Sequence, residues 1–368
     1  MTLPLSGVKI LDLSRVLAGP LATMMLADLG ADVIKIERPG TGDETRGYGP
    51  PFDERGESAY FLSINRGKLS VAADLTLEAD RALLERLIAQ ADVVVDNFRP
   101  GTLERRGLGV DAMLARHPQL IWCTITGFGL EEPRAGYDFV VQAESGWMAI
   151  TGDPDGSPMK IGVALADVLA GKDAAIAILA ALVRAPADRH LVVSLLHSAT
   201  AALVNVAQNA LITGRDAKRW GNAHPNLVPY QLFEAADRPI VIAVGADAQF
   251  GACARALGLD DLAADAALAT NAGRLAARDR VVGAIAVAVR TRDAAHWLGA
   301  LGAAGVPCGV VKPVLEALRE VSASPLTGVA PQAPGRVHLP PPTLDEHGAL
   351  VRAEGWAAFV RVGRPRDT

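Results

Sequence analysis

Residues 8–36 read VKILDLSRVLAGPLATMMLADLGADVIKI, and this stretch decides the fold class. Residues 8–13 and 31–36 are short apolar runs of the kind that form buried strands, and residues 19–29 between them have helical periodicity. A strand, a helix and a second strand within about 30 residues predict a βαβ unit with a parallel crossover.

The same alternation continues after this unit. Apolar runs separated by helical patterns predict further parallel strands with helices that cover them. Together they indicate an open, doubly wound, Rossmann-like α/β sheet. The predicted strands cover residues 68–73, 92–95 and 120–126, and the predicted helices cover residues 78–90 and 101–116.

The second half of the chain predicts two long helices and then a smaller α+β domain. A loop rich in Gly, Asn and Pro at residues 214–229 marks a domain boundary, and the Pro-rich stretch 330–342 is a linker. We therefore expect a large domain over residues 1–215, completed by residues 330–368, and a small domain over residues 222–329. The predicted helices are 163–184, 192–213, 246–257, 278–304 and 346–354, and the predicted strands are 230–235, 240–244 and 308–311.

The composition is that of an ordinary soluble protein, with 50% hydrophobic and 21% charged residues. The net charge of −5 predicts no general attraction for nucleic acid or anionic lipid. Cys123, Cys253 and Cys308 form neither a CxxC pair nor a metal spacing, which favours a reducing, cytoplasmic setting. The apolar stretch 161–183 contains three charged residues, so a buried helix is expected there rather than a membrane span.

Two nucleotide-binding motifs are incomplete. The first βα turn, residues 13–20, has one glycine, Gly19, where the dinucleotide fingerprint needs three small residues so that the backbone approaches a pyrophosphate. Gly67-Lys68 resembles the end of a P-loop, but it precedes a strand and lacks the upstream glycine and the following Ser or Thr. The sequence therefore disfavours an NAD-dependent oxidoreductase and a P-loop site.

Three arginines follow strands of the predicted sheet. Arg38 and Arg99 lie where two strands end, and Arg105 lies further along the segment that follows the second of them. Doubly wound folds bind ligands at this edge, and guanidinium groups grip phosphates in bidentate fashion. The three side chains either converge on an anionic ligand or pair with ordinary surface carboxylates, and position alone leaves both open.

Two carboxylates stand out. Asp138, which follows Tyr137, begins an apparent helix, so an N-cap is the plain interpretation. Asp167 has only apolar neighbours over residues 163–170, and a carboxylate in such a stretch is costly unless it is paired, capped or functional. A structural cap, a buried pair and a functional group all fit Asp167 when it is considered alone.

Together these segments resemble the family III CoA-transferases, which include carnitine- and bile-acid-related CoA-transferases and formyl-CoA:oxalate transferase. The resemblance runs in order over nearly the whole chain. The matching stretches are LDLSRVLAGP at 11–20, GADVIKIERPGTGD at 30–43, VVVDNFRPGTLERRGLG at 93–109, TGFG at 126–129, GYDFVVQAESGWMAITG at 136–152, ADVLAGKDAAIAILAAL at 166–182, GNAHPNLVPYQLFEAAD at 221–237 and PPTLDEHG at 341–348.

The resemblance implies a role for each candidate residue. In the AD-x-x-AG motif of the family the Asp is the nucleophile, here Asp167, and the acid after a Tyr, here Asp138, assists from a neighbouring helix. Coenzyme A is expected to lie along the main chain of the first βα turn, with arginines near its phosphates. The implied CoA-binding residues are Val16, Ala18, Arg38, Ala73, Asn97, Phe98, Arg105 and Tyr137.

The family also implies an activity and an assembly. CoA passes from an acyl-CoA to a carboxylic acid through mixed anhydride and aspartyl-CoA thioester intermediates. The expected partners are therefore an acyl-CoA and a small carboxylic acid, and no metal or other cofactor is required. Because the family fold interlocks two ring-like subunits, we expect a homodimer, without nucleic acid or membrane.

Three alternatives remain. The α-methylacyl-CoA racemases resemble this family but carry a His where this chain has Tyr137, which is a poor base. A CoA-binding homologue without activity is disfavoured by the intact Asp167 and Asp138, and an NAD-dependent oxidoreductase by the missing glycines. Leu17 stands where formate and oxalate members tend to have Gln, so oxalate is not expected as a substrate.

Two histidines lie in segments of interest. Residues 188–197 depart from the family pattern and carry His197 on an apolar helix face, so a core or interface histidine is expected there. His224 lies in the loop 214–229 and is a candidate substrate contact.

Overall fold

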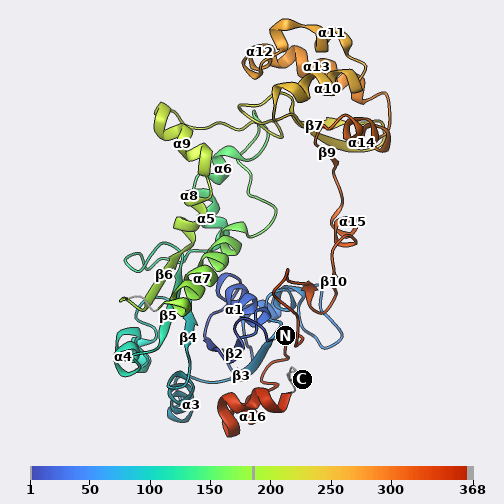
Figure 1. Cartoon of the computed structure of the whole chain (residues 1–368). Helices are drawn as coiled ribbons and strands as arrows, with labels where there is room; N and C mark the ends of the chain where they lie inside the picture. Colours follow the sequence, from blue (N-terminus) through green and yellow to red (C-terminus); the bar gives the residue numbers. More distant parts are fainter. Residues whose placement is uncertain (1, 185–186, 363–368) are drawn as a thin grey trace. The chain divides into compact units, whose positions relative to one another are not determined.

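The computed structural model describes residues 2–184 and 187–362, which divide into two compact units (Figure 1). The larger unit contains residues up to 148, residues 160–216 and residues from 321 on. The smaller unit contains residues 149–159 and 217–320. Residues 149–159 and 321–329 thus join the other unit than the sequence predicted, and residues 363–368 of the predicted large domain lie outside the described residues.

The larger unit is built on a sheet of six parallel strands in the order β3-β2-β1-β4-β5-β6. This is a doubly wound order, which reverses between β1 and β4 and opens a crevice at that point. It confirms the predicted α/β sheet. The strands are β1 (Lys9–Asp12), β2 (Asp32–Glu37), β3 (Lys68–Ala72), β4 (Val93–Asp96), β5 (Ile121–Thr126) and β6 (His190–Ser194).

The sixth strand corrects the predicted helix over residues 192–213. Residues 190–194 pair with β5, and two shorter helices follow, α8 (Leu195–Ala201) and α9 (Val204–Thr213). The apolar run at 191–193 contains two valines, whose branched side chains suit a strand. Ser194 then accepts a hydrogen bond from the backbone N–H of His197 at 3.4 Å and caps α8. His197 is exposed on α8, so it is not a core residue, and an interface position for it stays a prediction.

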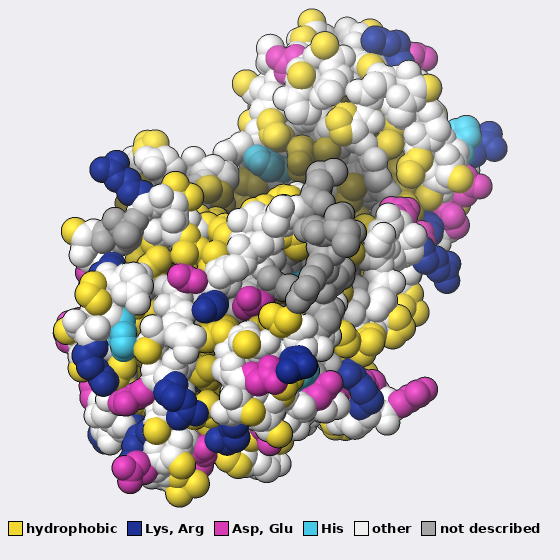
Figure 2. All heavy atoms as spheres, turned by 60° about the horizontal axis from the view of Figure 1, so that its bottom comes forward, with side chains coloured by type: hydrophobic (Ala, Val, Ile, Leu, Met, Phe, Trp, Pro, Cys, Tyr) yellow, Lys and Arg dark blue, Asp and Glu magenta, His cyan; other side chains and the backbone are white. Residues whose placement is uncertain are grey.

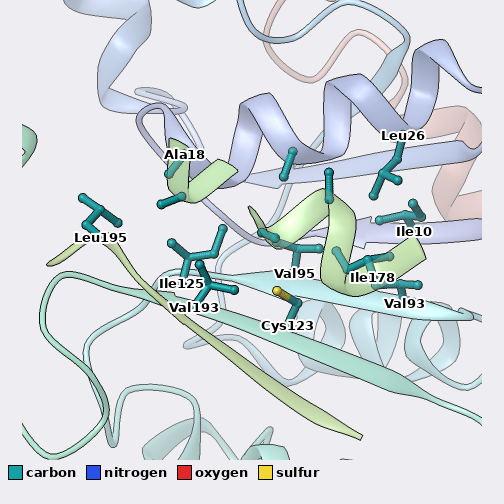
Figure 3. Close-up of a cluster of buried hydrophobic side chains, with 14 of the residues drawn as sticks. Ile10, Ala18, Leu26, Val93, Val95, Cys123, Ile125, Ile178, Val193 and Leu195 are labelled. Atoms are coloured by element: carbon teal, nitrogen blue, oxygen red, sulfur yellow. The ribbon is translucent and has the colours of Figure 1, made fainter. Parts of the chain in front are cut away.

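Helices cover both faces of the sheet (Figure 1). One face carries α1 (Ala18–Asp28) and α7 (Leu165–Val183), and the other carries α3 (Glu78–Ile88), α4 (Val110–Arg116) and α16 (Gly348–Glu354). Figure 3 shows the first of these cores, in which aliphatic side chains of α1 and α7 pack against those of the central strands. Each face buries its own apolar cluster, which accounts for the near-continuous apolar strands.

A glycine sets the distance between α1 and α7. A Cβ added to Gly171 would lie 2.6 Å from the carbonyl oxygen of Ala18. Only a residue without a side chain lets the two helices approach this closely. The contact brings the first turns of both helices together, and Asp167 lies one turn before Gly171.

The predicted helix over residues 101–116 is interrupted. A 3₁₀ turn at Glu104–Arg106 ends at Gly107, whose φ is +74°, and α4 begins only at Val110. The left-handed conformation of Gly107 stops the helical path, as glycine commonly does at a helix end.

The C-terminal segment of the larger unit returns to the edge of β3. The N–H of His347 donates to the carbonyl of Ser70 at 3.1 Å, and Arg352 pairs with Asp80 at 2.6 Å. Further on, the indole of Trp356 donates to the carbonyl of Leu87 at 3.1 Å. These contacts fix the end of the described chain against β3 and α3.

The smaller unit is an α+β structure. Its sheet is antiparallel in the order β7-β8-β9, which confirms the predicted hairpin. The predicted helix over 278–304 is two helices, because Asp293 accepts from the N–H of His296 at 2.8 Å and starts the second one. The elements are β7 (Tyr230–Glu234), β8 (Pro239–Ala243), α10 (Asp247–Ala256), α11 (Asp260–Ala264), α12 (Asn271–Ala276), α13 (Arg278–Val289), α14 (Ala294–Ala303), β9 (Cys308–Val310) and α15 (Val314–Leu318).

The remaining elements are short. They are the 3₁₀ turns η1 (Glu44–Gly47), η2 (Glu104–Arg106), η3 (Ala266–Leu268) and η4 (Gly355–Ala357), the helices α2 (Ala59–Leu62), α5 (Asp138–Glu144), α6 (Trp147–Ile150) and α17 (Ala358–Val362), and the strands β10 (Ala323–Ser324) and β11 (Gly328–Val329).

Charged side chains of both signs lie on the surface (Figure 2). On the face shown in Figure 2, Lys and Arg side chains are interspersed with Asp and Glu. Within residues 2–184 and 187–362 no single helix is long and apolar enough to cross a membrane, and α8 with α9 passes that test only as a pair bent by 75°.

A fully buried group of charges links the first three strands, between the carboxyl end of β1 and the amino end of β3. The ammonium of Lys68 on β3 pairs with Asp12 on β1 at 2.9 Å, and Lys35 on β2 pairs with Asp43 at 3.0 Å. All four side chains are buried. Burial by itself would raise the pKa of Asp12, but Lys68, Lys35 and a hydrogen bond from Ser14 outweigh it and hold that pKa below its usual range.

Every donor of Lys68 has a partner. Besides Asp12, its ammonium donates to the carbonyl of Pro20 at 2.9 Å and to Oδ1 of Asn65 at 2.8 Å. Burial lowers the pKa of Lys68 to about 8, although Asp12 opposes the shift. Charges buried in this way are tolerated only when all of their hydrogen-bonding groups are satisfied.

We expect Lys68→Met to lower the free energy of unfolding by about 3–5 kcal/mol, because it leaves Asp12 buried without its closest counter-charge. Urea unfolding followed by fluorescence measures the change. The control is Arg116→Met, since the pair of Arg116 with Glu85 is exposed, with the two groups 3.6 Å apart, and should contribute less than about 1 kcal/mol. Equal, small losses in both variants would contradict a structural role for the buried group.

Candidate active site

Two loops meet at the point where the strand order reverses. Residues 14–17 follow β1, and residues 97–100 follow β4. The amide of Asn97 holds the backbone of Arg15 from both sides, because its Oδ1 accepts from the N–H at 2.9 Å and its Nδ2 donates to the carbonyl at 2.7 Å. Ligands of doubly wound folds bind in this crevice.

The loop after β1 has an unusual backbone at Val16. Its φ is +66°, a conformation that a β-branched residue rarely adopts. The N–H of Val16 donates to both oxygens of Asp43 at 3.2 Å, and Asp43 is itself held by Lys35. The buried charges of the sheet edge therefore stabilise a strained turn, of the kind found at functional sites.

A cavity of about 390 Å³ opens beside this turn. It brings together six of the residues to which the family resemblance gives a role, from four separate parts of the chain. Leu17 and the first turn of α1 form one wall, and the segment 125–137 forms another. The predicted residues on its lining are Val16, Ala18, Asn97, Phe98, Tyr137 and Asp167.

A second cavity, of about 520 Å³, adjoins the first, because Arg15 and Phe98 line both. Arg38 and Ala73 line it, as the resemblance implies for a CoA site, and so does Arg106. Arg105 is exposed and donates to the hydroxyl of Thr102 at 3.3 Å instead. The two arginines are adjacent in the 3₁₀ turn Glu104–Arg106, and Arg106 rather than Arg105 lines this cavity.

Of the two alternatives left open for Arg38, Arg99 and Arg105, convergence on one point is not what the structure has. Arg38 lines the second cavity, whereas Arg99 lines the first. The two cavities place cations along an elongated path rather than around one point.

Asp167 lies in the first turn of α7 and is partly buried on the wall of the first cavity. Burial raises its pKa to about 7, and the negative charge of Asp138 adds to the shift. A carboxylate with a pKa near neutrality is typical of functional sites rather than of structural ion pairs.

Asp138 caps α7 rather than its own helix. It begins α5, and its Oδ1 accepts from the backbone N–H groups of Ala166 at 2.8 Å and of Asp167 at 3.4 Å. Its Oδ2 accepts from Gln142 at 2.7 Å. Asp138 thus satisfies the free N–H groups at the start of α7 and places a negative charge beside Asp167.

Two tyrosines that the sequence analysis missed lie close to these carboxylates. Burial raises the pKa of Tyr60 to about 12, and the charge of Asp167 adds to it. The ring of Tyr48 packs edge-on against Tyr60, with the ring centres 5.4 Å apart. With Tyr137, three of the four tyrosines of the chain gather here. The scarcity of tyrosine was the one feature of the sequence that drew attention to these residues.

A buried carboxylate supports the loop after β4. Asp96 accepts from the N–H of Phe98 at 3.0 Å and from Trp122 and Thr124 at 2.7 and 2.8 Å. Burial raises the pKa of Asp96 despite these hydrogen bonds. The hydroxyl of Thr124 also lies 2.9 Å from Nε2 of His190. These side chains fix the turn that carries Asn97 and Phe98.

His224 belongs to the smaller unit. Its ring packs against Tyr230, with centres 5.2 Å apart, and its Nδ1 accepts from the N–H of Asn226 at 3.0 Å. Its predicted contact with a substrate stays a prediction. Among the described residues no group of three or more His, Cys, Asp or Glu side chains has the arrangement of a metal site.

Comparison with known proteins gives consistent matches. The family model of CoA-transferase family III matches residues 5–330. A succinate–glutarate CoA-transferase of Agrobacterium fabrum is 41% identical over 95% of both chains, and an acetyl-CoA:oxalate CoA-transferase of Acetobacter aceti is 38% identical over 95% of both. A crystal structure of a CAIB/BAIF family protein from Brucella suis superimposes with a TM-score of 0.84 at 40% identity, covering 96% of this chain and 100% of that one.

The raised pKa of Asp167 predicts a pH-dependent stability. Its pKa in the folded chain, about 7, exceeds the ordinary aspartate value of 3.8. The carboxyl therefore ionises at lower pH in the unfolded chain, and stability is lost as the pH rises from about 4 to 7. Asp167→Asn removes this loss. We expect the variant to gain on the order of 1–3 kcal/mol over the parent at pH 8 and little at pH 4.

Urea unfolding at several pH values measures this difference. Asp138→Asn should retain Asp167 but weaken the pH dependence, because the neighbouring negative charge is gone. Asp173→Asn controls for the loss of any carboxylate from α7. A difference between Asp167→Asn and the parent that stays constant from pH 4 to pH 8 would argue against an elevated pKa at Asp167.

Proposed function

The chain belongs to CoA-transferase family III, and we propose that it exchanges CoA between dicarboxylic acids through a thioester on Asp167. The observation that carries this proposal is Asp167 itself, a poorly hydrated carboxylate on the wall of a cavity at the topological switch point. The names of relatives include succinate, glutarate, oxalate and mesaconate as CoA acceptors or donors, and one of them, from Acetobacter aceti, also names acetyl-CoA. Each of these names contains at least one dicarboxylate, which supports that substrate class.

The reaction begins with two acyl transfers that free the donor acid. The carboxylate of Asp167 attacks the thioester carbonyl of the donor, the C–S bond breaks, and a mixed anhydride and CoA thiolate form. The thiolate then attacks the aspartyl carbonyl of the anhydride and releases the donor as a free carboxylate. Asp167 now carries CoA as a thioester.

The acceptor reverses these steps. Its carboxylate attacks the aspartyl thioester, which gives a second mixed anhydride and again the thiolate. The thiolate attacks the acceptor carbonyl, so a new acyl-CoA leaves and Asp167 returns as a carboxylate. One thioester replaces another and no proton is gained or lost overall, so the cycle needs no ATP, metal or redox cofactor.

The state of Asp167 suits a nucleophile. With a pKa of about 7, a large part of the group is ionised at neutral pH. The burial that raises the pKa of Asp167 also removes water that would otherwise solvate the carboxylate and lower its nucleophilicity. Asp138 assists by holding the first turn of α7 in place, which fixes the backbone from which Asp167 projects.

The oxyanion of each tetrahedral intermediate needs N–H donors. The N–H of Val16 is already taken by Asp43. The first turn of α1, which begins at Ala18 on the cavity wall, instead supplies N–H groups without helical partners and the positive end of a helix dipole. We assign oxyanion stabilisation to this turn.

The adjoining cavities suit the length of coenzyme A. In this proposal Arg38 and Arg106 hold its phosphates, Ala73 borders the adenine, and Asn97 and Phe98 flank the pantetheine on its way to Asp167. Arg105 is adjacent to Arg106 and exposed, and in this proposal it binds the outermost phosphate of coenzyme A.

The racemase alternative is less well supported. It requires a second base beside the aspartate, and this chain has at that place Tyr137, a 61% exposed phenol that is a poor general base. A CoA-binding homologue without activity does not account for the raised pKa of Asp167. The three free cysteines support a reducing compartment such as the cytoplasm.

A homodimer is also proposed. None of the described residues of α9 is buried, although Val204, Leu211 and Ile212 are 70%, 78% and 74% exposed. On α7, Ile176 and Val183 are 64% and 88% exposed. Apolar residues so exposed on two helices of one unit mark an interaction surface, and a second copy of the chain is the partner that the family fold implies.

Intact-protein mass spectrometry after mixing with succinyl-CoA tests the function. We expect an adduct of the mass of CoA on the parent chain, cleaved by hydroxylamine, and its complete loss in Asp167→Ala. Asp173→Ala on the same helix should keep the adduct. Exchange of an α-proton of an acyl-CoA with deuterated water, without any adduct, would instead identify a racemase.

Light scattering tests the dimer. We expect twice the chain mass of 38.4 kDa, and the monomer mass for Leu211→Asp combined with Ile212→Asp. Leu77→Asp, at an exposed leucine before α3, is the control and should stay dimeric. A parent chain that elutes as a monomer at micromolar concentration refutes the assembly without touching the chemistry.

A further inference from the structure

The first cavity contains a cation that no step of the proposed reaction uses. Arg15 lies in the turn after β1 and lines both cavities. It therefore lies where the second cavity, which Arg38 lines, adjoins the first, which Asp167 lines. Neither the attack by Asp167 nor the stabilisation of the oxyanion requires a guanidinium at this point. Its chemistry is therefore available for recognition.

The guanidinium of Arg15 is only partly satisfied. Its Nη1 pairs with Glu44, and its Cζ lies 5.5 Å from the centre of the Phe98 ring. Its Nε is buried and has no hydrogen-bond partner among the described residues. A buried donor left unpaired is costly, and a carboxylate is the group that a guanidinium edge binds best.

The backbone of Arg15 is fixed independently of its side chain. The two hydrogen bonds from Asn97 and the neighbouring contact of Val16 with Asp43 hold the turn. The base of the side chain is therefore held in place relative to α1, and α1 is held to α7 through Gly171. A group fixed in this way relative to Asp167 is suited to measure the length of an acyl chain.

The other arginines of the cavity are less suited. Arg134 is neutralised by Glu144 through two hydrogen bonds of 2.6 Å and stacks on Phe128 at 3.6 Å. Arg99 is an exposed residue of the loop 97–100. Arg15 is the arginine of this lining that combines a buried free donor with a fixed backbone.

We infer that Arg15 binds the distal carboxylate of the dicarboxylic acyl group and so selects diacids over monoacids, an inference that rests on the proposed function. Glu44 is then the internal competitor, because it occupies Nη1 when no diacid is bound. A pyrophosphate is a poorer occupant of this position than a single carboxylate, because its larger negative charge would be repelled more strongly by the carboxylate of Glu44.

The test compares succinyl-CoA with butyryl-CoA, which have the same chain length and differ in the distal carboxylate. The rate of CoA adduct formation on Asp167 gives kcat/KM for each donor. We expect the parent to prefer succinyl-CoA, and Arg15→Met to lose about 10- to 100-fold of that preference while its rate with butyryl-CoA changes little. Arg15→Lys should recover part of the preference, as a point charge without the fork.

Two further variants make the outcome decisive. Arg99→Met removes the same charge from the same cavity and should lower both donors by one common factor. Glu44→Gln frees Nη1 and should increase the preference for succinyl-CoA, and it tests the idea even if Arg15→Met fails to fold.

An equal loss for both donors in Arg15→Met would assign Arg15 to CoA itself and overturn the inference. So would a parent chain that forms the adduct equally fast with both donors, although the transferase function would then stand. A parent chain that forms no adduct with either donor refutes the proposed function instead, so the two failures are distinguishable.

Discussion

Four buried charges, on Asp12, Lys35, Asp43 and Lys68, constrain the rest of the larger unit. Lys68 with Asp12 and Lys35 with Asp43 are out of contact with water, and such pairs seldom add net stability. What they provide is geometry. Because Asp43 also accepts the N–H of Val16, the turn after β1 has one conformation, with a positive φ that the side chain alone would disfavour.

A second constraint follows from two helix N-termini that meet. Gly171 lets α7 approach the start of α1, and Asp138 satisfies the N–H groups at the start of α7. The cap that stabilises the helix is the same charge that raises the pKa of Asp167. The carboxylate of Asp138 thus has both a structural role and an electrostatic one, and it performs both from the same position.

Much of the architecture was predictable because apolar periodicity is local. The strands up to β5 and the hairpin of the smaller unit follow from it, as does the prominence of Asp167 in an apolar stretch. β6 was missed because its apolar run continues without a break into α8, and only Ser194 marks the change. Lys35 and Lys68 were not recognised as partners of acids because their pairing is set by sheet order, which links residues far apart in sequence. Arg106 was not singled out, because a continuous helix was predicted where the chain forms a 3₁₀ turn.

The arrangement of the two cavities adds a consequence for selectivity. Arg15 and Phe98 line both cavities. A ligand in the second cavity, which Arg38 lines, therefore lies next to the Arg15 side chain that also lines the first cavity. Under the proposed function the pantetheine of CoA would pass this point while the acyl group lies beyond it, and it would shield the guanidinium from water on one side. A guanidinium shielded in this way binds a carboxylate more strongly, since the Coulomb attraction grows as the local dielectric falls. Discrimination between acids would then be sharpest when CoA is in place, which is the state in which the mixed anhydride forms and the choice of acid has chemical effect.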